Sequence, residues 1–206
     1  MYKITISKQI MARILSHGAG NRVFTPNDFF DIGDRPAINQ ALCRLVRSGD
    51  IRRINRGLYD LPQTDTNNIE TLSIDLDLVI DAICRRDCVR ALPSPNQCAY
   101  DLGLREDPPD NIVYDTDGFR RIIRIGETDI RFRRASVKVL RWYGRKSAHL
   151  AQAVRIFRPN VEQYQSLPYR LNRAVSPEIR DDFIAHSYDL PVHLQAIAKA
   201  MKDLVT

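Results

Sequence analysis

The sequence has no long hydrophobic run, and its 206 residues include only four cysteines and one tryptophan. No stretch approaches the roughly 20 uninterrupted apolar residues of a membrane-spanning helix, so we expect no membrane partner. The N-terminus has no apolar signal-peptide core, because Lys8 interrupts it, and we therefore expect a cytoplasmic protein. Apolar residues at 44% and charged residues at 27% are typical of a globular chain with one or two domains.

The cysteines do not predict a disulfide or a metal site. Cys84 and Cys88 are one helical turn apart, but a zinc site needs about four ligands. None of the four histidines shares a ligand-spaced motif with Cys43, Cys84, Cys88 or Cys98. In a reducing cytosol we expect these cysteines to be small buried hydrophobic residues, with no metal and no cofactor.

Catalytic motifs are also missing. The chain has no phosphate-binding loop, nucleophile elbow or zinc-protease helix motif. Four acids lie near a predicted strand and would be the candidates for a nuclease metal site: Asp107, Asp110, Asp115 and Asp117. They fall at turn positions, where aspartate is favoured for local hydrogen bonding. We predict that the protein is not an enzyme and keep a DNA-processing activity as an alternative.

Positive charge gathers in the first third of the chain. The net charge is +6, and residues 1–62 carry ten Lys and Arg against five Asp, which leaves +5 in that segment. A basic segment attached to a nearly neutral remainder indicates a polyanionic partner, bound mainly by the N-terminal third.

Three helical segments are predicted in this basic third. Apolar residues recur at helical spacing over residues 7–17, a Thr25-Pro26 start opens a short second helix, and a third begins at Asp34 and closes near Gly49. Two short helices joined by a tight glycine turn match a helix-turn-helix, whose second helix enters the major groove. Its polar face carries side chains that match base edges, namely Arg35, Asn39, Gln40, Arg44 and Arg47.

Residues 51–61 predict a β-hairpin that turns at residues 55–57 and ends before Pro62. Its arginines, Arg52, Arg53 and Arg56, are placed like a wing that holds phosphates. Such contacts give salt-dependent affinity, while base-edge contacts give specificity. We predict a winged-helix DNA-binding domain over residues 1–62. The alternatives are a solvated helix face without a partner and a winged helix that contacts protein.

The remaining residues predict a linker over 63–74 and a second domain over 75–206. The fold class is therefore α+β: a winged helix-turn-helix, then an α+β domain with a small antiparallel sheet and C-terminal helices. The expected elements are a helix over 75–86, a short strand over 89–92, a helix opened by Ser94-Pro95, three strands between 112 and 134, and helices from 147 with breaks at Pro159, Pro177 and Pro191.

The three strands are dense in arginine, and two interpretations stay open for them. One is a second anion-binding surface for nucleic acid or a protein partner. The other is the polar face of a half-exposed sheet, balanced by nearby acids. The residues are Arg120, Arg121, Arg124, Arg131, Arg133 and Arg134.

Residues 24–29, 35–42, 44–49 and 51–62 resemble the AbiE-type (type IV) antitoxin family, with the run RGLYDLP in the predicted wing as the most specific part. Residues 93–97, 102–104, 114–118 and 120–125 resemble that family's segment after the linker. The resemblance covers about residues 7–158, and beyond that only a helical pattern is shared.

The resemblance implies an antitoxin with a role in phage defence. Its winged helix would bind inverted repeats in double-stranded operator DNA and repress its own operon. Its C-terminal domain would be needed to counter a nucleotidyltransferase-like toxin, often without a stable complex. Carried over, Arg35, Asn39, Gln40 and Arg44 would read bases, and Arg52, Arg53 and Arg56 would hold phosphates. The alternatives are a stand-alone regulator without a toxin partner and a protein-interaction module.

Overall fold

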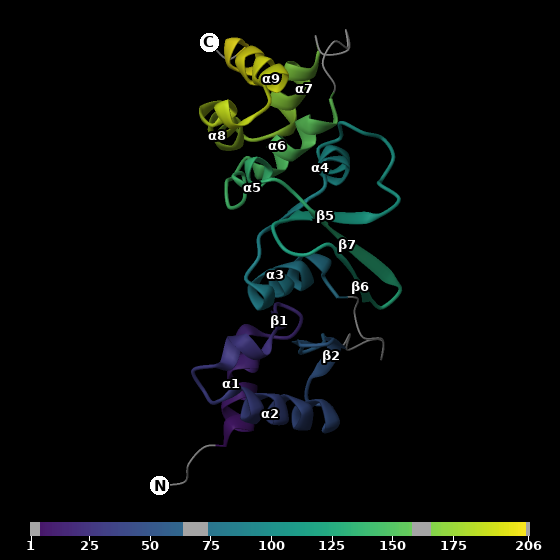
Figure 1. Ribbon diagram of the computed structural model, residues 1–206, viewed down its shortest axis with the longest axis vertical. Helices are drawn as coiled ribbons and strands as arrows, with labels where there is room; N and C mark the ends of the chain where they lie inside the picture. The colour runs from purple at the N-terminus through teal and green to yellow at the C-terminus, as the bar shows by residue number, and fades with distance from the viewer. Residues whose placement is uncertain (1–4, 64–73, 158–165, 205–206) are drawn as a thin grey trace. The chain divides into compact units, whose positions relative to one another are not determined.

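The computed structural model describes residues 5–63, 74–157 and 166–204 (Figure 1). The chain divides into two compact units: unit 1 comprises residues 1–89 and 124–127, and unit 2 comprises residues 90–123 and 128–206. Helices and small sheets are combined in the chain, which confirms the predicted α+β class. Within the described ranges, no helix has the length and apolar character needed to cross a bilayer.

Unit 1 begins with three helical elements: α1 (Ile6–His17), the 3-10 helix η1 (Pro26–Phe29) and α2 (Arg35–Arg47). Asp34 caps α2, because its Oδ1 accepts a hydrogen bond from the Ala37 N–H at 2.9 Å. The apolar stripes of α1 and α2 share one core with η1, as the helical spacing predicts. The fully buried members of this core are Ile10, Ile14, Phe24, Phe29, Ile38 and Leu42.

A three-stranded antiparallel sheet completes the early part of unit 1, with strand order β1-β3-β2. The predicted hairpin is confirmed as β2 (Arg52–Asn55) and β3 (Leu58–Asp60). Its turn passes through Gly57 with φ +70°, a backbone conformation that favours glycine. The third strand, β1 (Val23–Phe24), was not predicted, since two residues carry no alternation pattern.

Helix α3 (Leu76–Asp87) belongs to unit 1, although the sequence analysis assigns it to the second domain. Its C-terminal arginines explain the difference. Arg85 Nη2 donates to the Val23 carbonyl at 2.7 Å, and Asn27 Nδ2 donates to the Arg86 carbonyl at 3.0 Å. These bonds connect residues about 60 positions apart, which a single sequence does not reveal. Most of the predicted linker, residues 64–73, lies outside the described residues.

A four-stranded sheet has the order β4-β5-β7-β6 and is formed by β4 (Ala91–Pro93), β5 (Ile112–Thr116), β7 (Thr128–Arg134) and β6 (Arg121–Ile125) (Figure 1). All of it belongs to unit 2 except the last two residues of β6. β4 and β5 are antiparallel, but β5 and β7 are parallel. The prediction of an antiparallel sheet is therefore wrong, and the sheet is mixed. The reason is that β7 lies between β5 and β6, so these two strands, although consecutive in the chain, are not neighbours in the sheet.

The helical elements of unit 2 are α4 (Pro95–Asp101), α5 (Val137–Leu140), α6 (Ala148–Ala153), η2 (Val154–Ile156), α7 (Leu167–Ala174), α8 (Pro177–Ala185), η4 (Ser187–Asp189) and α9 (Val192–Asp203). The later helices build most of the main core, whereas Cys98 and Ala99 of α4 lie in a smaller cluster with Ala153. Trp142 and Phe183 meet in the main core, with ring centroids 5.9 Å apart. The helix starts predicted at Pro177 and after Pro191 are confirmed, and the break predicted at Pro159 lies outside the described residues.

Candidate nucleic-acid interface

Helix α2 has one buried and one exposed face. Its apolar side chains, Ile38, Ala41, Leu42 and Leu45, lie in the core of unit 1. The opposite face exposes all five residues that the sequence analysis assigned to base recognition: Arg35, Asn39, Gln40, Arg44 and Arg47. In the part of the chain that the structure describes, none of these five side chains has an intramolecular polar partner. Their donors and acceptors are therefore available to a ligand.

Cys43 lies on the same exposed face, one helical turn from both Asn39 and Arg47. The prediction that all four cysteines are buried is wrong for Cys43 and for Cys88, which are exposed. Cys43 falls opposite the apolar stripe of α2, and Cys88 caps α3 in a left-handed conformation with φ +54°. The prediction is confirmed for Cys84 and Cys98.

The three arginines of the hairpin β2–β3 differ in how available their guanidinium groups are to a ligand. Arg52 is paired across the hairpin with Asp60, with Nε–Oδ1 at 3.0 Å and Nη2–Oδ2 at 2.6 Å. The two residues face each other in the strand register. Arg53 and Arg56 are exposed, and neither pairs with an acid in the described residues. We predicted that Arg52 holds a phosphate. In the structure Asp60 already occupies its guanidinium group and would compete with a phosphate for it.

Helix α3 supports the turn of this hairpin. Arg86 Nη1 donates to the Arg56 carbonyl at 2.9 Å, and Arg86 is itself paired with Asp87. The sequence alone does not indicate this role of Arg86, since Arg86 lies 30 positions from Arg56.

A second network surrounds Asp28, whose side chain is only 12% exposed. Its carboxylate accepts hydrogen bonds from the Thr25 N–H at 2.7 Å and the Thr25 hydroxyl at 3.0 Å. Arg22 and Arg85 lie within 3.4 Å of it. Burial opposes ionisation of Asp28, but these hydrogen bonds and charges outweigh it, and its pKa is lowered. This network ties η1 to α3.

Four of the six arginines predicted as a second basic surface line one cavity of about 530 Å³: Arg120, Arg121, Arg131 and Arg133. Arg121 lies over the ring of Phe132, 5.3 Å from its centroid. Arg134 lines a separate cavity, and Arg124 is exposed on β6.

Arg133 bears on both interpretations of the arginine-rich strands, an anion-binding surface and a polar sheet face balanced by acids. It is exposed, yet its Nε donates to Asp115 Oδ1 at 2.8 Å. Asp115 is buried, and its other oxygen accepts from Gln152 Nε2 at 3.2 Å. At this position an acid balances the arginine, as the polar-face interpretation predicts.

Two of the four acids considered for a nuclease site pair with arginines. Asp115 pairs with Arg133, and Asp117 accepts bonds from the Arg90 N–H at 2.8 Å and its guanidinium at 2.9 Å. Burial works against ionisation of Asp117, but these bonds dominate and lower its pKa. In the described part of the chain, no group of three or more histidine, cysteine or acidic residues is placed to hold a metal ion.

A family model of unknown function, DUF6088, matches residues 9–166, about three quarters of the chain. The chain belongs to the DUF6088 family. The DUF6088 match begins within α1, includes α2, the hairpin and α3, and continues through the sheet of unit 2. The family is therefore defined by residues of both units. Comparisons with curated proteins and with solved structures give no match.

Proposed function

We propose that this DUF6088 protein is a DNA-binding regulator in which unit 1 acts as a winged helix. In this proposal α2 is the recognition helix, and the β2–β3 hairpin is the wing. The observation that carries it is the exposed face of α2, where five polar or cationic side chains lack intramolecular partners within the described residues. A 13-residue helix is about 20 Å long, and the major groove admits a helix of this kind.

The pairing of arginines in unit 1 supports this assignment. One group is neutralised by aspartates: Arg13, Arg22, Arg52, Arg85 and Arg86. The other group has no acid partner in the described residues: Arg35, Arg44, Arg47, Arg53 and Arg56. All members of the second group lie on α2 or on the hairpin. The arginines of this group are thus located on the two elements that a winged helix presents to DNA.

The uncharged members of the α2 face supply the means for specificity. The amides of Asn39 and Gln40 each carry a donor and an acceptor, which match the major-groove edge of adenine. Arg35 and Arg44 match the two acceptors of guanine. In this proposal Arg53 and Arg56 contact phosphates, while Arg52 stabilises the hairpin through Asp60.

We further propose that the DNA is the protein's own operator and that the protein is a type IV antitoxin. The support is the resemblance of residues 7–158 to AbiE-type antitoxins, including the RGLYDLP run of the hairpin. Unit 2 would then counter a nucleotidyltransferase-like toxin. A stand-alone regulator would bind the operator equally well but would not restore growth when a neighbouring toxin gene is expressed.

The test is fluorescence anisotropy with duplex DNA from upstream of the gene and with a shuffled duplex of the same length. We expect the upstream duplex to bind about 1,000-fold more tightly or better, which is where the usual range for specific recognition begins. Gln40→Ala should reduce that ratio. Lys8→Ala removes an exposed charge from α1 and serves as the matched control, with affinity within twofold of wild type. Equal affinity for both duplexes would refute the base-reading assignment.

A protein-interaction module gives a different result. In that case Arg53→Glu and Arg56→Glu would leave DNA affinity unchanged and abolish capture of a protein partner. For the antitoxin role, the measurement is growth of cells that express the adjacent gene with and without this chain.

A further inference from the structure

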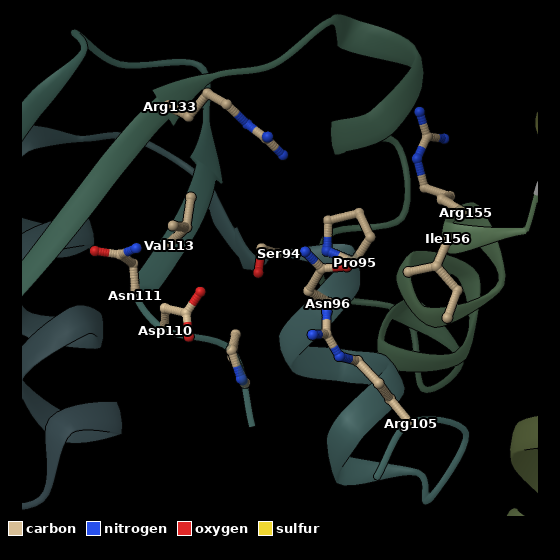
Figure 2. A pocket seen from close by; sticks show the side chains of 11 residues that line it. Ser94, Pro95, Asn96, Arg105, Asp110, Asn111, Val113, Arg133, Arg155 and Ile156 are labelled. Carbon is tan, nitrogen blue, oxygen red and sulfur yellow. The ribbon is translucent and has the colours of Figure 1, made fainter. Parts of the chain in front are cut away.

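Unit 2 contains a cavity of about 450 Å³ between β5, β7, α4 and η2 (Figure 2). Three arginines from separate segments line it: Arg105 after α4, Arg133 on β7 and Arg155 in η2. Figure 2 shows the side chains of Arg133 and Arg105 entering from opposite sides, with Asn96 between them. The volume lies within the range of about 300–1,000 Å³ typical of small-molecule sites.

The charge of these arginines is only partly balanced. Asp115 pairs with Arg133 at 2.8 Å, and Asp110 is the acid that lines the cavity itself. In the described residues, Arg105 and Arg155 have no hydrogen-bond or ion-pair partner. Two guanidinium groups are therefore available at one cavity.

Arg155 is the more informative of the two, because it is half-buried. Burial lowers its pKa, Asp115 opposes this effect, and Arg133 adds to it. Partial burial disfavours the guanidinium charge, and no protein acceptor in the described residues compensates for it. An anion bound in the cavity would accept hydrogen bonds from Arg155 and stabilise its charge.

The rest of the lining is mixed in a way that suits an organic anion. Asn96 and Asn111 contribute amide groups, while Pro95, Val113 and Ile156 contribute apolar surface. Guanidinium groups recognise phosphate oxygens with paired hydrogen bonds. A bare phosphate ion would leave the apolar part of the cavity uncovered.

We propose that this cavity binds a small phosphorylated organic ligand of nucleotide size. Lining guanidinium groups bind the phosphate, and the organic part packs on the apolar residues. This inference does not depend on DNA binding by unit 1, because every residue of the cavity belongs to unit 2.

The test is isothermal titration calorimetry of the full chain with AMP and ADP as probes. Adenosine is the uncharged comparison, inorganic phosphate and pyrophosphate represent the free anions, and a four-nucleotide single strand represents nucleic acid. We expect AMP or ADP to bind, and adenosine to bind at least tenfold more weakly, since charge-assisted hydrogen bonds dominate the affinity.

Two variants locate the site. Arg155→Gln and Arg105→Gln should each weaken nucleotide binding by about tenfold or more. Arg131→Gln is the matched control, because it removes an exposed arginine from β7 that does not line this cavity. If Arg155→Gln does not fold, the exposed Arg105 still provides the test.

Three results would overturn the proposal. They are the absence of nucleotide binding at millimolar concentration, equal losses in Arg105→Gln and Arg131→Gln, and binding of the oligonucleotide or free phosphate in preference to AMP and ADP. Loss of nucleotide binding with unchanged affinity for duplex DNA would support it.

Discussion

Arg52 and Asp60 form a two-point ion pair across the β2–β3 hairpin, with nitrogen–oxygen distances of 3.0 and 2.6 Å. The carboxylate is nearly enclosed at 6% exposure, and the guanidinium is 32% exposed. The guanidinium group of Arg52 is therefore bound by an acid of the same hairpin. Arg52 has a structural role that Arg53 and Arg56 do not share.

Replacing Arg52 with alanine should lower the free energy of unfolding by about 1–3 kcal/mol, because it leaves the buried Asp60 carboxylate without its partner. Urea unfolding measures the effect. Arg53→Ala is the matched control on the same strand and should change stability by less than about 0.5 kcal/mol. Equal effects of the two substitutions would contradict the structural role of Arg52.

Arg56→Ala should weaken binding to all duplexes alike and reduce the slope of log affinity against log salt by about 1, because one phosphate contact is lost. The measurement is anisotropy at several salt concentrations. Asn39→Ala should instead cost about 1–3 kcal/mol on the upstream duplex and leave the salt slope unchanged. A changed salt slope for Asn39→Ala would show that it does not act on base edges.

The Asp28 network predicts a loss of stability in acid. The pKa of Asp28 is lowered in the folded protein, so its contribution is complete above the unfolded pKa near 3.9 and is lost as the pH falls through the lower folded value. Asp28→Asn should be less stable than wild type at pH 7, and the difference should shrink between pH 4 and pH 2. Urea unfolding at each pH measures this, and parallel curves would rule it out.

Cysteine labelling offers a footprint of the α2 face. Cys43 and Cys88 are exposed, whereas Cys98 is buried and its thiol pKa is raised to about 12, first by burial and then by the nearby acids. A maleimide should therefore modify Cys43 and Cys88 in the native protein and leave Cys98 intact. Bound operator DNA should slow labelling of Cys43 at least fivefold and leave Cys88 unchanged. Mass spectrometry reads both sites, and equal protection would place the DNA elsewhere.

Single helices and the hairpin could be predicted from the sequence, because residues close together in the chain determine them. The stripe of Ile38, Leu42 and Leu45 predicts both the span of α2 and its exposed face. The Asn55-Arg56-Gly57 turn predicts the hairpin, and Ser176-Pro177 predicts the start of α8.

What the sequence did not reveal depends on distant partners. The pairing of Arg52 with Asp60 follows from strand register, and the placement of α3 follows from bonds between Arg85 and Val23. Arg155 was not predicted as a site residue, although a charge among the apolar residues of 153–156 is a signal that could have marked it. Its meaning depends on Arg105 and Arg133, which only the fold brings to the same cavity.

The position of β7 between β5 and β6 has a consequence for the order of folding. β5 comes before β6 in the chain, yet its neighbours in the sheet are β4 and β7, and β7 is the last of the four strands in the chain. Loop closure is less costly for the short β6–β7 connection than for the longer β5–β7 connection. We expect the β6–β7 hairpin to form first and to dock afterwards onto β5 as a preassembled ribbon. Until then, β5 has an unpaired edge that an emerging chain has to protect from other strands.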